Sequence, residues 1–321
     1  MGSYCVNRFK DKGRGSFKAV TFTGVVLLLA ACSNHVPTKN VYSSLAPTNI
    51  PINFTSSYPV ISEGVLIADG PYKGLDAYAL IKNFAGPRSI ESPGLYANNH
   101  PGEPHIYEAK DAVVGNHFVF TLHKNNDKDR DVVSIKDRQR NEIKGYAGSS
   151  DTLKAFKSEV VSYSWKFKLN EDITMSKNFG HFFQLKAVDG GVGTPILTIS
   201  GRDKEGEWLE VIHTIHGKKT VLTKVPLEAI KGRWLQVNAY VDYSNDGKLD
   251  LMVTDMTNGR RVIDLSLADI DMLRGEGKND FVRPKWGIYR SLRSQDMLRE
   301  EEEKVFFADF LVQKLQPSSK S

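Results

Sequence analysis

The fold class follows from one stretch of the sequence, which reads WLQVNAYVDY over residues 234–243, SNDG over 244–247 and KLDLMVT over 248–254. In both flanking segments apolar and polar residues alternate, which is the pattern of strands with one buried face. Between them, Asn245-Asp246-Gly247 is a strong signal for the tight turn of a hairpin. The stretch therefore predicts two antiparallel strands joined by a short turn.

The same alternation recurs along the chain in short segments. They cover residues 117–123, 137–144, 160–169, 181–186, 195–199, 208–215, 285–291 and 305–314. Only Gly74–Phe84 and Leu265–Arg274 show the spacing of short helices. Many strands, few helices and frequent turns indicate an all-β fold, an antiparallel β-sandwich with a few short helices. The sequence has no βαβ rhythm, no GxGxxG and no GxxxxGK[ST], which excludes Rossmann and P-loop nucleotide-binding folds.

The positive charge of the chain is concentrated near its beginning. Lys and Arg number 43 against 38 Asp and Glu, which gives a formal net charge of +5. Five of the cations and one acid precede residue 32, so four net charges belong to that stretch and the rest is close to neutral. A general nucleic-acid-binding surface needs a basic balance in the folded part, so we expect no nucleic-acid partner.

An apolar run follows the first cations and ends in Leu29-Ala30-Ala31-Cys32. It is too short for a membrane-spanning helix but suits the apolar region of a secretory signal peptide. Its end resembles the lipobox of bacterial lipoproteins, in which the Cys is lipidated and becomes the mature N-terminus. We therefore expect residues 1–31 to be a signal peptide and Cys32 to carry a lipid anchor. An ordinary cleaved signal peptide is the alternative.

A tether is expected between the lipid and the folded domain. Of the 25 residues from Ser33 to Ser57, 15 are Ser, Thr, Asn or Pro, a composition that cannot bury enough apolar surface to fold. We expect residues 32–57 to be flexible and residues 58–317 to form one monomeric domain. Ser33 after the Cys resembles the outer-membrane sorting pattern, so we expect the protein at the outer membrane or surface of a Gram-negative bacterium. Cys5 would leave with the signal peptide, so no disulfide is expected.

The segment 137–144 is the most unusual of the predicted strands. With a period of two, Arg138, Arg140, Glu142 and Lys144 share one face. Charged residues protect edge strands, so a solvated edge is one interpretation. Three cations and one acid in a row also suit the floor of a groove for a polyanion. The strand alone favours neither interpretation.

Three further strands place polar side chains opposite an apolar face. Each pattern alone is more often structural, but together they indicate a site. The polar residues are Lys166 and Lys168 opposite Trp165 and Phe167, Gln184 and Lys186 on the segment 181–186, and Tyr289 opposite Trp286, Ile288 and Arg290.

These strands resemble those of the jelly-roll polysaccharide lyases. Alginate lyases of this fold carry an Arg-x-Glu-x-Arg strand, a Gln-x-His strand and a Tyr-x-Lys-x-Gly-x-Tyr strand. The first is similar to Arg140-x-Glu142, and the second to Gln184-x-Lys186, in which a lysine replaces the histidine. Of the third motif the chain keeps Lys285, Gly287 and Tyr289.

The longer runs 137–144, 163–169 and 181–188 look most like polysaccharide lyase family 28, the jelly-roll ulvan lyases. The resemblance covers residues 69–315. It implies a jelly-roll domain that cleaves a uronate-containing acidic polysaccharide by β-elimination and leaves 4,5-unsaturated uronate ends. It also implies endo-acting cleavage without a required cofactor. Ulvan stands ahead of glucuronan and alginate as the expected substrate.

β-Elimination requires a group that neutralises the uronate carboxylate, a base for the C5 proton and an acid for the leaving oxygen. Arg140 can form a bidentate fork to the carboxylate, with Gln184 adding a hydrogen bond and Glu142 orienting Arg140. Tyr289 suits the acid. The resemblance favours a strand lysine as the base, best matched by Lys166 with a lowered pKa. The alternatives for the base are Lys186, His181 and Tyr289 itself. The expected substrate-binding residues are Arg138, Lys144, Lys168, His181, Lys186 and Arg290.

Metal-binding patterns are weak. The segment 242–250 looks like part of a calcium loop, but Val253 stands where position 12 requires a Glu, so a plain hairpin is preferred. The polar segment 125–131 is expected to be a solvated loop, although it could hold an ion or form a groove wall. His213 and His216 have no third ligand nearby, which argues against zinc. The run Glu301 to Glu303 is also expected to be solvated. We expect no metal in the site, with a structural calcium ion as an alternative.

Two other functional classes compete with a lyase. A non-catalytic glycan-binding surface lipoprotein would use the same sandwich and needs cations and aromatic residues, but no acid–base pair. A retaining glycoside hydrolase needs two close carboxylates on one strand. Glu205, Glu207 and Glu210 do not match the Glu-x-Asp-x-x-Glu pattern of such enzymes.

Overall fold

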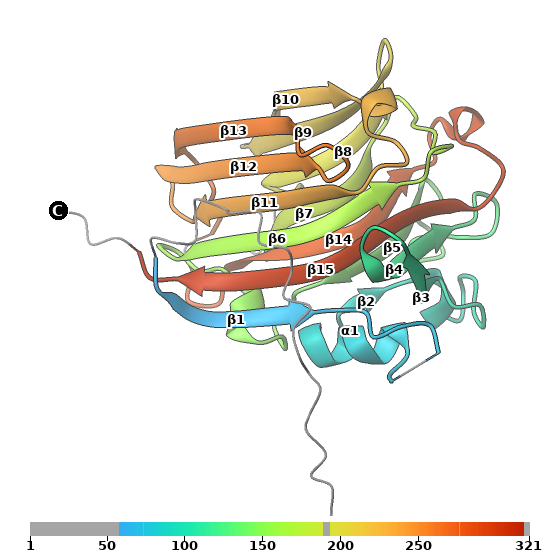
Figure 1. Cartoon of the computed structure of the whole chain (residues 1–321), viewed down its shortest axis with the longest axis horizontal. Coiled ribbons are helices and arrows are strands. Elements are labelled where there is room, and N and C mark those ends of the chain that lie inside the picture. The colour runs from blue at the N-terminus through green and yellow to red at the C-terminus, as the bar shows by residue number, and fades with distance from the viewer. Residues whose placement is uncertain (1–57, 73, 189–192, 276, 318–321) are drawn as a thin grey trace, which may run out of the picture. The chain divides into compact units, whose positions relative to one another are not determined.

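The computed structural model describes residues 58–72, 74–188, 193–275 and 277–317, and these form two antiparallel β-sheets packed as a sandwich (Figure 1). The all-β sandwich expected from the sequence is confirmed. The expected signal peptide, Cys32 and the tether lie outside the described residues. In the described part of the chain, no helix has the length and apolar character needed to cross a bilayer.

The first sheet has eight strands among the described residues, in the order β13-β12-β11-β6-β15-β4-β3, with β1 paired to β15. Figure 1 shows β13, β12, β11, β6, β15 and β1 side by side. The strands are β1 Val60–Leu66, β3 Ile106–Asp111, β4 Gly115–Leu122, β6 Val160–Leu169, β11 Leu235–Asp242, β12 Gly247–Asp255, β13 Arg261–Ile270 and β15 Glu303–Leu315. Asp242 pairs with Lys248 across the turn, which confirms the predicted hairpin.

The second sheet has seven strands in the described residues, in the order β10-β9-β8-β7-β14-β5-β2. They are β2 Ile90–Glu91, β5 Arg138–Lys144, β7 Gly180–Val188, β8 Leu197–Asp203, β9 Glu207–Ile215, β10 Lys218–Pro226 and β14 Phe281–Ser291. β5 pairs with β14 on one side and with the two-residue β2 on the other. Arg140 and Glu142 in its middle are buried, so the interpretation of β5 as a solvated edge strand is wrong.

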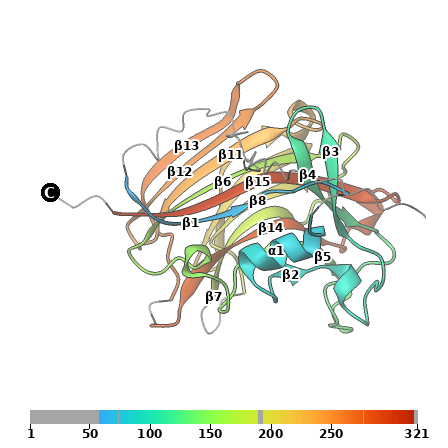
Figure 2. The same ribbon diagram turned by 60° about the horizontal axis from the view of Figure 1, so that its bottom comes forward.

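Helices are few, as expected. The helix α1 spans Ala77–Ala85, is capped by the Asp76 carboxylate on the Ala79 N–H, and lies near β2 and β5 in Figure 2. Short 3₁₀ turns are η1 Pro93–Leu95, η2 Asp151–Leu153, η3 Leu227–Ala229 and η4 Gln295–Met297. The helix expected over Leu265–Arg274 is wrong. Leu265 and Leu267 pair with Leu251 and Leu249 of β12, and this ladder satisfies the backbone as a strand.

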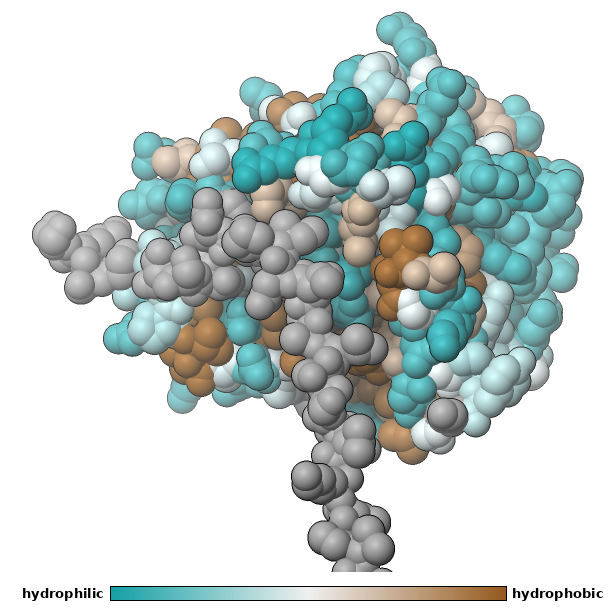
Figure 3. All heavy atoms as spheres, in the orientation of Figure 1, coloured by the Kyte–Doolittle hydropathy of each residue, from teal (hydrophilic) through white to brown (hydrophobic). Residues whose placement is uncertain are grey.

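Aromatic side chains from both sheets meet in the core and define which faces point inward. Trp165 of β6 lies 4.4 Å from Phe183 of β7 and 6.1 Å from Trp286 of β14, measured between ring centroids. Side chains one residue away from these therefore point to the outer face of their own sheet. In the orientation of Figure 1, the surface of the described residues is mostly hydrophilic, with hydrophobic groups in small separate patches (Figure 3).

The pairing of strands in the second sheet is irregular at two places. The ladder between β7 and β8 shifts between His181 and Phe183, and both Phe182 and Phe183 are buried. His181 and Gln184 therefore share the outer face, although three positions separate them. The ladder between β14 and β7 shifts between Trp286 and Tyr289, next to Gly287. At Gly287 φ is 140°, and an added Cβ would collide with the β5 backbone.

Candidate active site

Three neighbouring strands bring a tyrosine, an arginine and a histidine into one row on the outer face of the second sheet. Tyr289 of β14 is the cross-strand partner of Arg140 on β5 and of His181 on β7. His181 in turn pairs with Ser200 on β8. Because side chains of directly paired residues stand next to each other, the row places these groups together.

Tyr289 is held on two sides by cations. The guanidinium carbon of Arg140 lies 3.7 Å from the centre of the phenol ring. Arg138 donates a hydrogen bond from Nη1 to the Tyr289 hydroxyl oxygen over 3.1 Å. Since the hydroxyl accepts this bond, its own proton is free to be donated elsewhere. The arrangement suits a general acid.

His181 is oriented by hydroxyl groups on the neighbouring strand. Its Nδ1 lies 2.8 Å from the Ser200 Oγ, and the Ser200 hydroxyl donates to Thr198 Oγ1 over 2.8 Å. The Ser200 oxygen therefore accepts the Nδ1 proton, and the lone pair of the imidazole lies on Nε2. The imidazole is stacked on Phe179 with ring centroids 4.9 Å apart, and its centroid lies 5.9 Å from that of Tyr289.

The charge state of His181 follows from its surroundings. Burial lowers the pKa of His181 well below its ordinary value, and the nearby cations Arg202, Lys219, Arg140 and Lys285 lower it further. The imidazole is therefore neutral near pH 7. A neutral imidazole with its lone pair on Nε2 is suited to accept a proton as a general base.

A buried ion network lies behind the tyrosine. Arg140 donates from Nε and Nη2 to the Asp129 carboxylate, at 2.8 and 3.3 Å, and from Nη1 to Glu142 and Glu91, at 2.7 and 3.3 Å. Lys285 donates to Glu91 at 2.8 Å and to Glu142 at 2.6 Å. Burial alone would raise the pKa of Glu91, but Lys285 and Arg140 outweigh it and lower that pKa well below the ordinary value. Glu91 therefore stays ionised near neutral pH.

This network corrects the expected roles of Arg140 and Gln184. The fork of Arg140 is already filled by Asp129, so it is not free to clamp a substrate carboxylate. Gln184 is 2 % exposed and donates from Nε2 to Glu142, so its amide also belongs to the network. Arg140 lies against the ring of Tyr289, and Glu142 accepts a hydrogen bond from its guanidinium.

A hollow lined by cations opens beside Tyr289 and His181. Its inner part has a volume of about 160 Å³ and its outer part about 360 Å³. We call the two together the cationic hollow. Among the described residues that line its outer part, six are cations and only Asp137 is an acid. The cations are Arg138, Lys177, Arg202, Lys204, Lys219 and Arg293.

Arg202 is a cation of this hollow with an unsatisfied N–H group. Its Nε lies 3.6 Å from the Glu210 carboxylate, and this buried N–H makes no hydrogen bond to the described part of the chain. Burial and the charge of Arg202 lower the pKa of Lys219, which lines the same hollow. A ligand anion would satisfy both groups.

Lys166 and Lys168 lie on the other sheet, which corrects their expected roles. Both point to the outer face of the first sheet, where Lys166 pairs with Asp309 at 2.5 Å and Lys168 with Asp111 at 2.9 Å. The aromatic core, including Trp165, separates them from Tyr289. Neither Lys166 as the base nor Lys168 as a substrate-binding residue fits this position.

The sequence-based prediction that Arg290 binds substrate is also wrong. It is 4 % exposed, donates from Nε to Gln139 Oε1 at 3.0 Å and faces Glu303 of the other sheet at 3.5 Å. Because Arg290 alternates with Tyr289, its side chain points into the sandwich and not to the site. Lys144 lies on the correct face, where its ammonium binds Glu91 at 2.6 Å.

Lys186 lies on the site face but further along its strand. It pairs with Arg283, whereas His181 pairs with Tyr289. At about 3.3 Å per residue, the two backbone positions on β7 are some 13 Å apart once the bulge is counted. Burial, Lys285 and Arg140 lower the pKa of Lys186 to about 8, and its ammonium donates to the Gly193 carbonyl. Of the candidate bases, His181 is the one adjacent to Tyr289.

Several site residues were missed by sequence reasoning. The segment 125–131 is not a solvated loop, because Asp127 and Asp129 are 2 % and 1 % exposed. Glu91, Arg202 and Lys219 were not recognised either. Their contacts join elements far apart in the chain, and no local pattern marks them. The spacing Asp127-x-Asp129, with both carboxylates in one polar segment, was the available signal for the loop.

No protein-family model and no curated protein matches the sequence. Solved structures match by fold. The alginate lyase Aly36B superposes with a TM-score of 0.51 at 10% sequence identity, covering 81% of this chain and 100% of that chain. The marine PL-14 alginate lyase from Aplysia kurodai superposes with a TM-score of 0.50 at 9% identity, covering 81% and 100%. The described domain therefore has the jelly-roll fold that these lyases share.

Proposed function

We propose that the chain is an endo-acting lyase that cleaves a uronate-containing acidic polysaccharide by β-elimination. The observation that carries this proposal is the neutral His181 beside the proton-donating Tyr289, at the edge of the cationic hollow. A glycan-binding module needs cations and aromatic rings, but it has no use for a base and an acid in adjacent positions. The jelly-roll fold and the resemblance of the strand motifs agree with a lyase.

In the proposed reaction, His181 Nε2 takes the C5 proton of the uronate residue. The electron pair of that bond forms the C4–C5 double bond, and the bond between C4 and its glycosidic oxygen breaks. Tyr289 gives its hydroxyl proton to the leaving oxygen. Proton transfer by positioned groups of this kind typically contributes about 10²- to 10⁴-fold in rate.

The carboxylate of the uronate has to be neutralised so that its C5 proton becomes acidic. Arg140 cannot do this, because Asp129 fills its fork. We assign this role to Arg202, which lines the hollow next to Tyr289 and His181 and whose Nε makes no hydrogen bond to the described residues. The fork of Arg138 is filled by Asp137, as that of Arg140 is by Asp129. A guanidinium offers a carboxylate two parallel hydrogen bonds, so Arg202 is suited to the task.

Ulvan is the proposed substrate, ahead of glucuronan and alginate. A single uronate carboxylate needs one or two cations, whereas six described cations line the outer part of the hollow. The additional cations suit a polymer that carries sulfate groups in addition to uronate. Charge-assisted hydrogen bonds from arginine and lysine would hold such groups.

The test is a panel of ulvan, glucuronan, alginate and a heparin-type glycan, with ultraviolet absorbance of the unsaturated uronate as the readout and the size of the products as a second measurement. We expect absorbance to rise with ulvan and long oligosaccharides to appear first. Product only from alginate or glucuronan would overturn the assignment of ulvan but keep the lyase. Retention of the polymers on an affinity gel without any product would show a glycan-binding protein instead.

The proposed location is the outer membrane, through a lipid on Cys32. The lipobox-like sequence Leu29-Ala30-Ala31-Cys32 supports this proposal. Cys32→Ser should release the protein from membranes or block its processing. Unchanged membrane fractionation of that variant would contradict a lipid anchor.

A further inference from the structure

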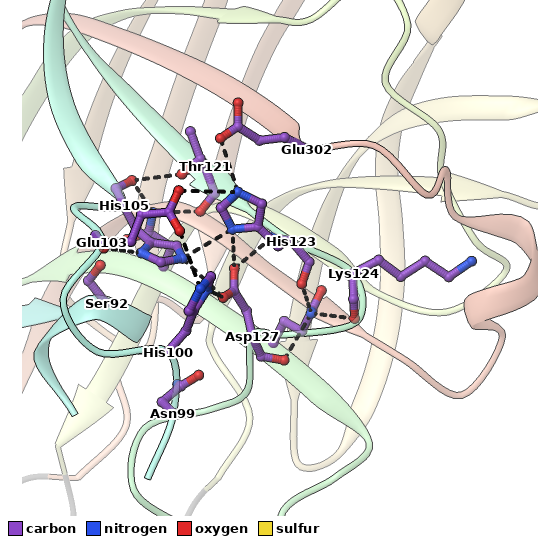
Figure 4. Close-up of polar contacts among 12 residues, drawn as sticks. Ser92, Asn99, His100, Glu103, His105, Thr121, His123, Lys124, Asp127 and Glu302 are labelled. Carbon is purple, nitrogen blue, oxygen red and sulfur yellow. Dashed lines mark hydrogen bonds and ion pairs between the residues drawn. The ribbon is translucent and has the colours of Figure 1, made fainter. Parts of the chain in front are cut away.

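Four side chains with metal-binding atoms converge on one point outside the proposed catalytic pair. They are His100, His105, His123 and Asp127, which we call the triple-histidine cluster (Figure 4). His100 and His105 lie in the segment that leads into β3, and His123 and Asp127 lie in the loop that follows β4. Since β3 and β4 pair as a hairpin, the two segments meet at the same end of these strands.

The ligand atoms of the cluster lie close together. Asp127 Oδ1 is 2.8 Å from His100 Nδ1 and 3.0 Å from His105 Nε2, and Asp127 Oδ2 is 3.4 Å from His123 Nδ1. His123 Nδ1 is 3.2 Å from His105 Nε2. Around a metal ion with bonds of about 2.0–2.1 Å, tetrahedral ligand atoms are about 3.3 Å apart. The ligand atoms of the four residues all lie within 4.8 Å of one another, so small shifts of the side chains would give a tetrahedral site.

The outward nitrogen of each histidine has an acceptor of its own. His105 Nδ1 lies 2.6 Å from the Glu103 carbonyl oxygen, and His100 Nε2 lies 3.3 Å from the Glu103 carboxylate. His123 Nε2 lies 3.2 Å from the Glu302 carboxylate. Metal-binding histidines commonly have such outer partners, which orient the ring so that the inner nitrogen can bind the ion.

The inner side of the cluster therefore presents three imidazole nitrogens and a carboxylate to one point. Either a bound metal ion or protons shared between these groups must offset the repulsion among their lone pairs. The side chains of His105 and Asp127 are fully buried, and those of His100 and His123 are 24% and 22% exposed. Water can therefore do little to separate the groups, and one metal ion would satisfy all four of them at once.

We propose that the triple-histidine cluster binds one divalent transition-metal ion, zinc by its ligand chemistry, as a structural centre. Three imidazole nitrogens and one carboxylate oxygen form a four-ligand set of the kind that Zn²⁺ prefers. Calcium and magnesium prefer oxygen ligands, so they do not suit three nitrogens. The ion ties the segment before β3 to the loop after β4.

This centre supports the active site through β5. The side chain of Gln139 donates to the carbonyl oxygens of His123, Lys124 and Asp127, at 2.8, 2.9 and 2.9 Å. Two residues beyond Asp127 in the same loop, Asp129 holds the guanidinium of Arg140. A metal that fixes the loop therefore fixes the partner of the arginine on which Tyr289 rests.

The inward face of β5 makes a second connection to the same centre. Asn141 donates from Nδ2 to the carbonyl oxygens of His105 and Thr121, at 2.7 and 2.9 Å. Gln139 and Asn141 thus hold both metal-binding segments, while Arg140 between them faces the active site. The metal acts on the reaction only through this positioning, so its binding can be measured without any activity assay.

The experiment uses the purified, untagged full chain, stripped with a chelator and then equilibrated with zinc. We expect one zinc ion per chain by elemental analysis. Cobalt(II) in its place should give the strong visible absorption of a tetrahedral site. His123→Gln and Asp127→Asn should each weaken zinc binding by at least ~100-fold, because loss of an outer partner alone typically costs about 10- to 100-fold. Circular dichroism checks that the variants are folded.

Two further variants sharpen the test. Glu302→Gln keeps all four ligands and removes only the carboxylate outside His123, so it should lower zinc affinity by about 10- to 100-fold. His216→Asn is the matched control, because His216 is an exposed histidine at a positive φ of 46° and should not change zinc binding. A stripped wild-type chain that takes up no zinc would overturn the proposal and show a cluster held by a shared proton. If the wild type and His123→Gln retained zinc equally, the zinc would be bound elsewhere on the surface, and the proposal would be wrong.

Discussion

The guanidinium carbon of Arg140 lies 3.7 Å from the ring centre of Tyr289, while Asp129 holds the same guanidinium through two hydrogen bonds. A cation over an aromatic ring is worth about 2 kcal/mol or more when water is excluded. The ring of Tyr289 is therefore held in position by a group that is itself fixed by a buried carboxylate. In the proposed mechanism, the group that reacts, Tyr289, is thus distinct from the group that positions it, Arg140.

Tyr289→Phe tests the proposed acid. The change keeps the ring on Arg140 and removes only the hydroxyl, so packing should be unaffected. If the hydroxyl protonates the leaving oxygen, turnover should fall by about 10²- to 10⁴-fold while the polysaccharide still binds. Initial rates of unsaturated product and retention on a substrate gel measure the two effects. A variant with nearly full turnover would remove Tyr289 from the mechanism.

Asp129→Asn tests the positioning of Arg140. Removing one partner of a buried ion pair typically costs about 3–5 kcal/mol of stability, and we expect a loss toward the lower end because Glu142 and Glu91 remain. Turnover should fall more than substrate affinity, because Asp129 does not line the cationic hollow. Denaturant unfolding and the separate values of kcat and KM measure these effects.

The matched control for Asp129 is Asp264→Asn. Asp264 pairs with Arg261 at 2.8 Å, but both side chains are more than half exposed, so that pair contributes only about 0–1 kcal/mol. The control should leave both stability and turnover close to those of the wild type. Equal effects of the two substitutions would mean that Asp129 has no special role.

The pH dependence of kcat/KM distinguishes His181 from Lys186 as the base. A base must be deprotonated to act, so activity rises with pH through its pKa. Burial and nearby cations lower the pKa of His181 well below 6.5, so activity should already be high at pH 6.5. The pKa of Lys186 is about 8, so a lysine base would instead give a rise near pH 8.

Variants complete this test. His181→Ala should remove most activity, whereas Lys166→Gln should retain it, because Lys166 lies on the far sheet beside Asp309. A rise in activity near pH 8 that disappears in Lys186→Gln would assign the base to Lys186 and contradict our proposal.

The sequence predicts the sandwich, the hairpin at 234–254 and the charged face of β5 because these depend on local alternation and turn residues. Alternation shows that Lys166 lies opposite Trp165, but it does not show which sheet carries the strand. The bulge that turns His181 to the same face as Gln184 leaves no mark in the pattern. The position of Asp129 next to Arg140 depends on how a loop folds back over β5, which only tertiary packing decides.

Glu303 offers a test of the buried charges by the pH dependence of stability. The run Glu301 to Glu303 was expected to be solvated, but Glu303 begins β15 and is fully buried. Burial raises the pKa of Glu303 to about 7 from its ordinary value of 4.5, with Arg290 opposing the rise. Below pH 4.5 both the folded and unfolded states hold the proton, so the group has no effect there. Between pH 4.5 and 7 the unfolded state releases the proton first, so the free energy of unfolding falls as the pH rises.

The shift corresponds to a loss of at most about 3 kcal/mol, complete near pH 7 and constant above it. Glu303→Gln cannot titrate, so its stability should lack this fall. The measurement is the difference in unfolding free energy between the wild type and the variant, followed by denaturant unfolding from pH 4 to 8. All other titrating groups cancel in that difference, apart from those that contact Glu303 directly. A difference that does not change with pH would mean that Glu303 is already ionised in the folded protein, held by Arg290 at 3.5 Å.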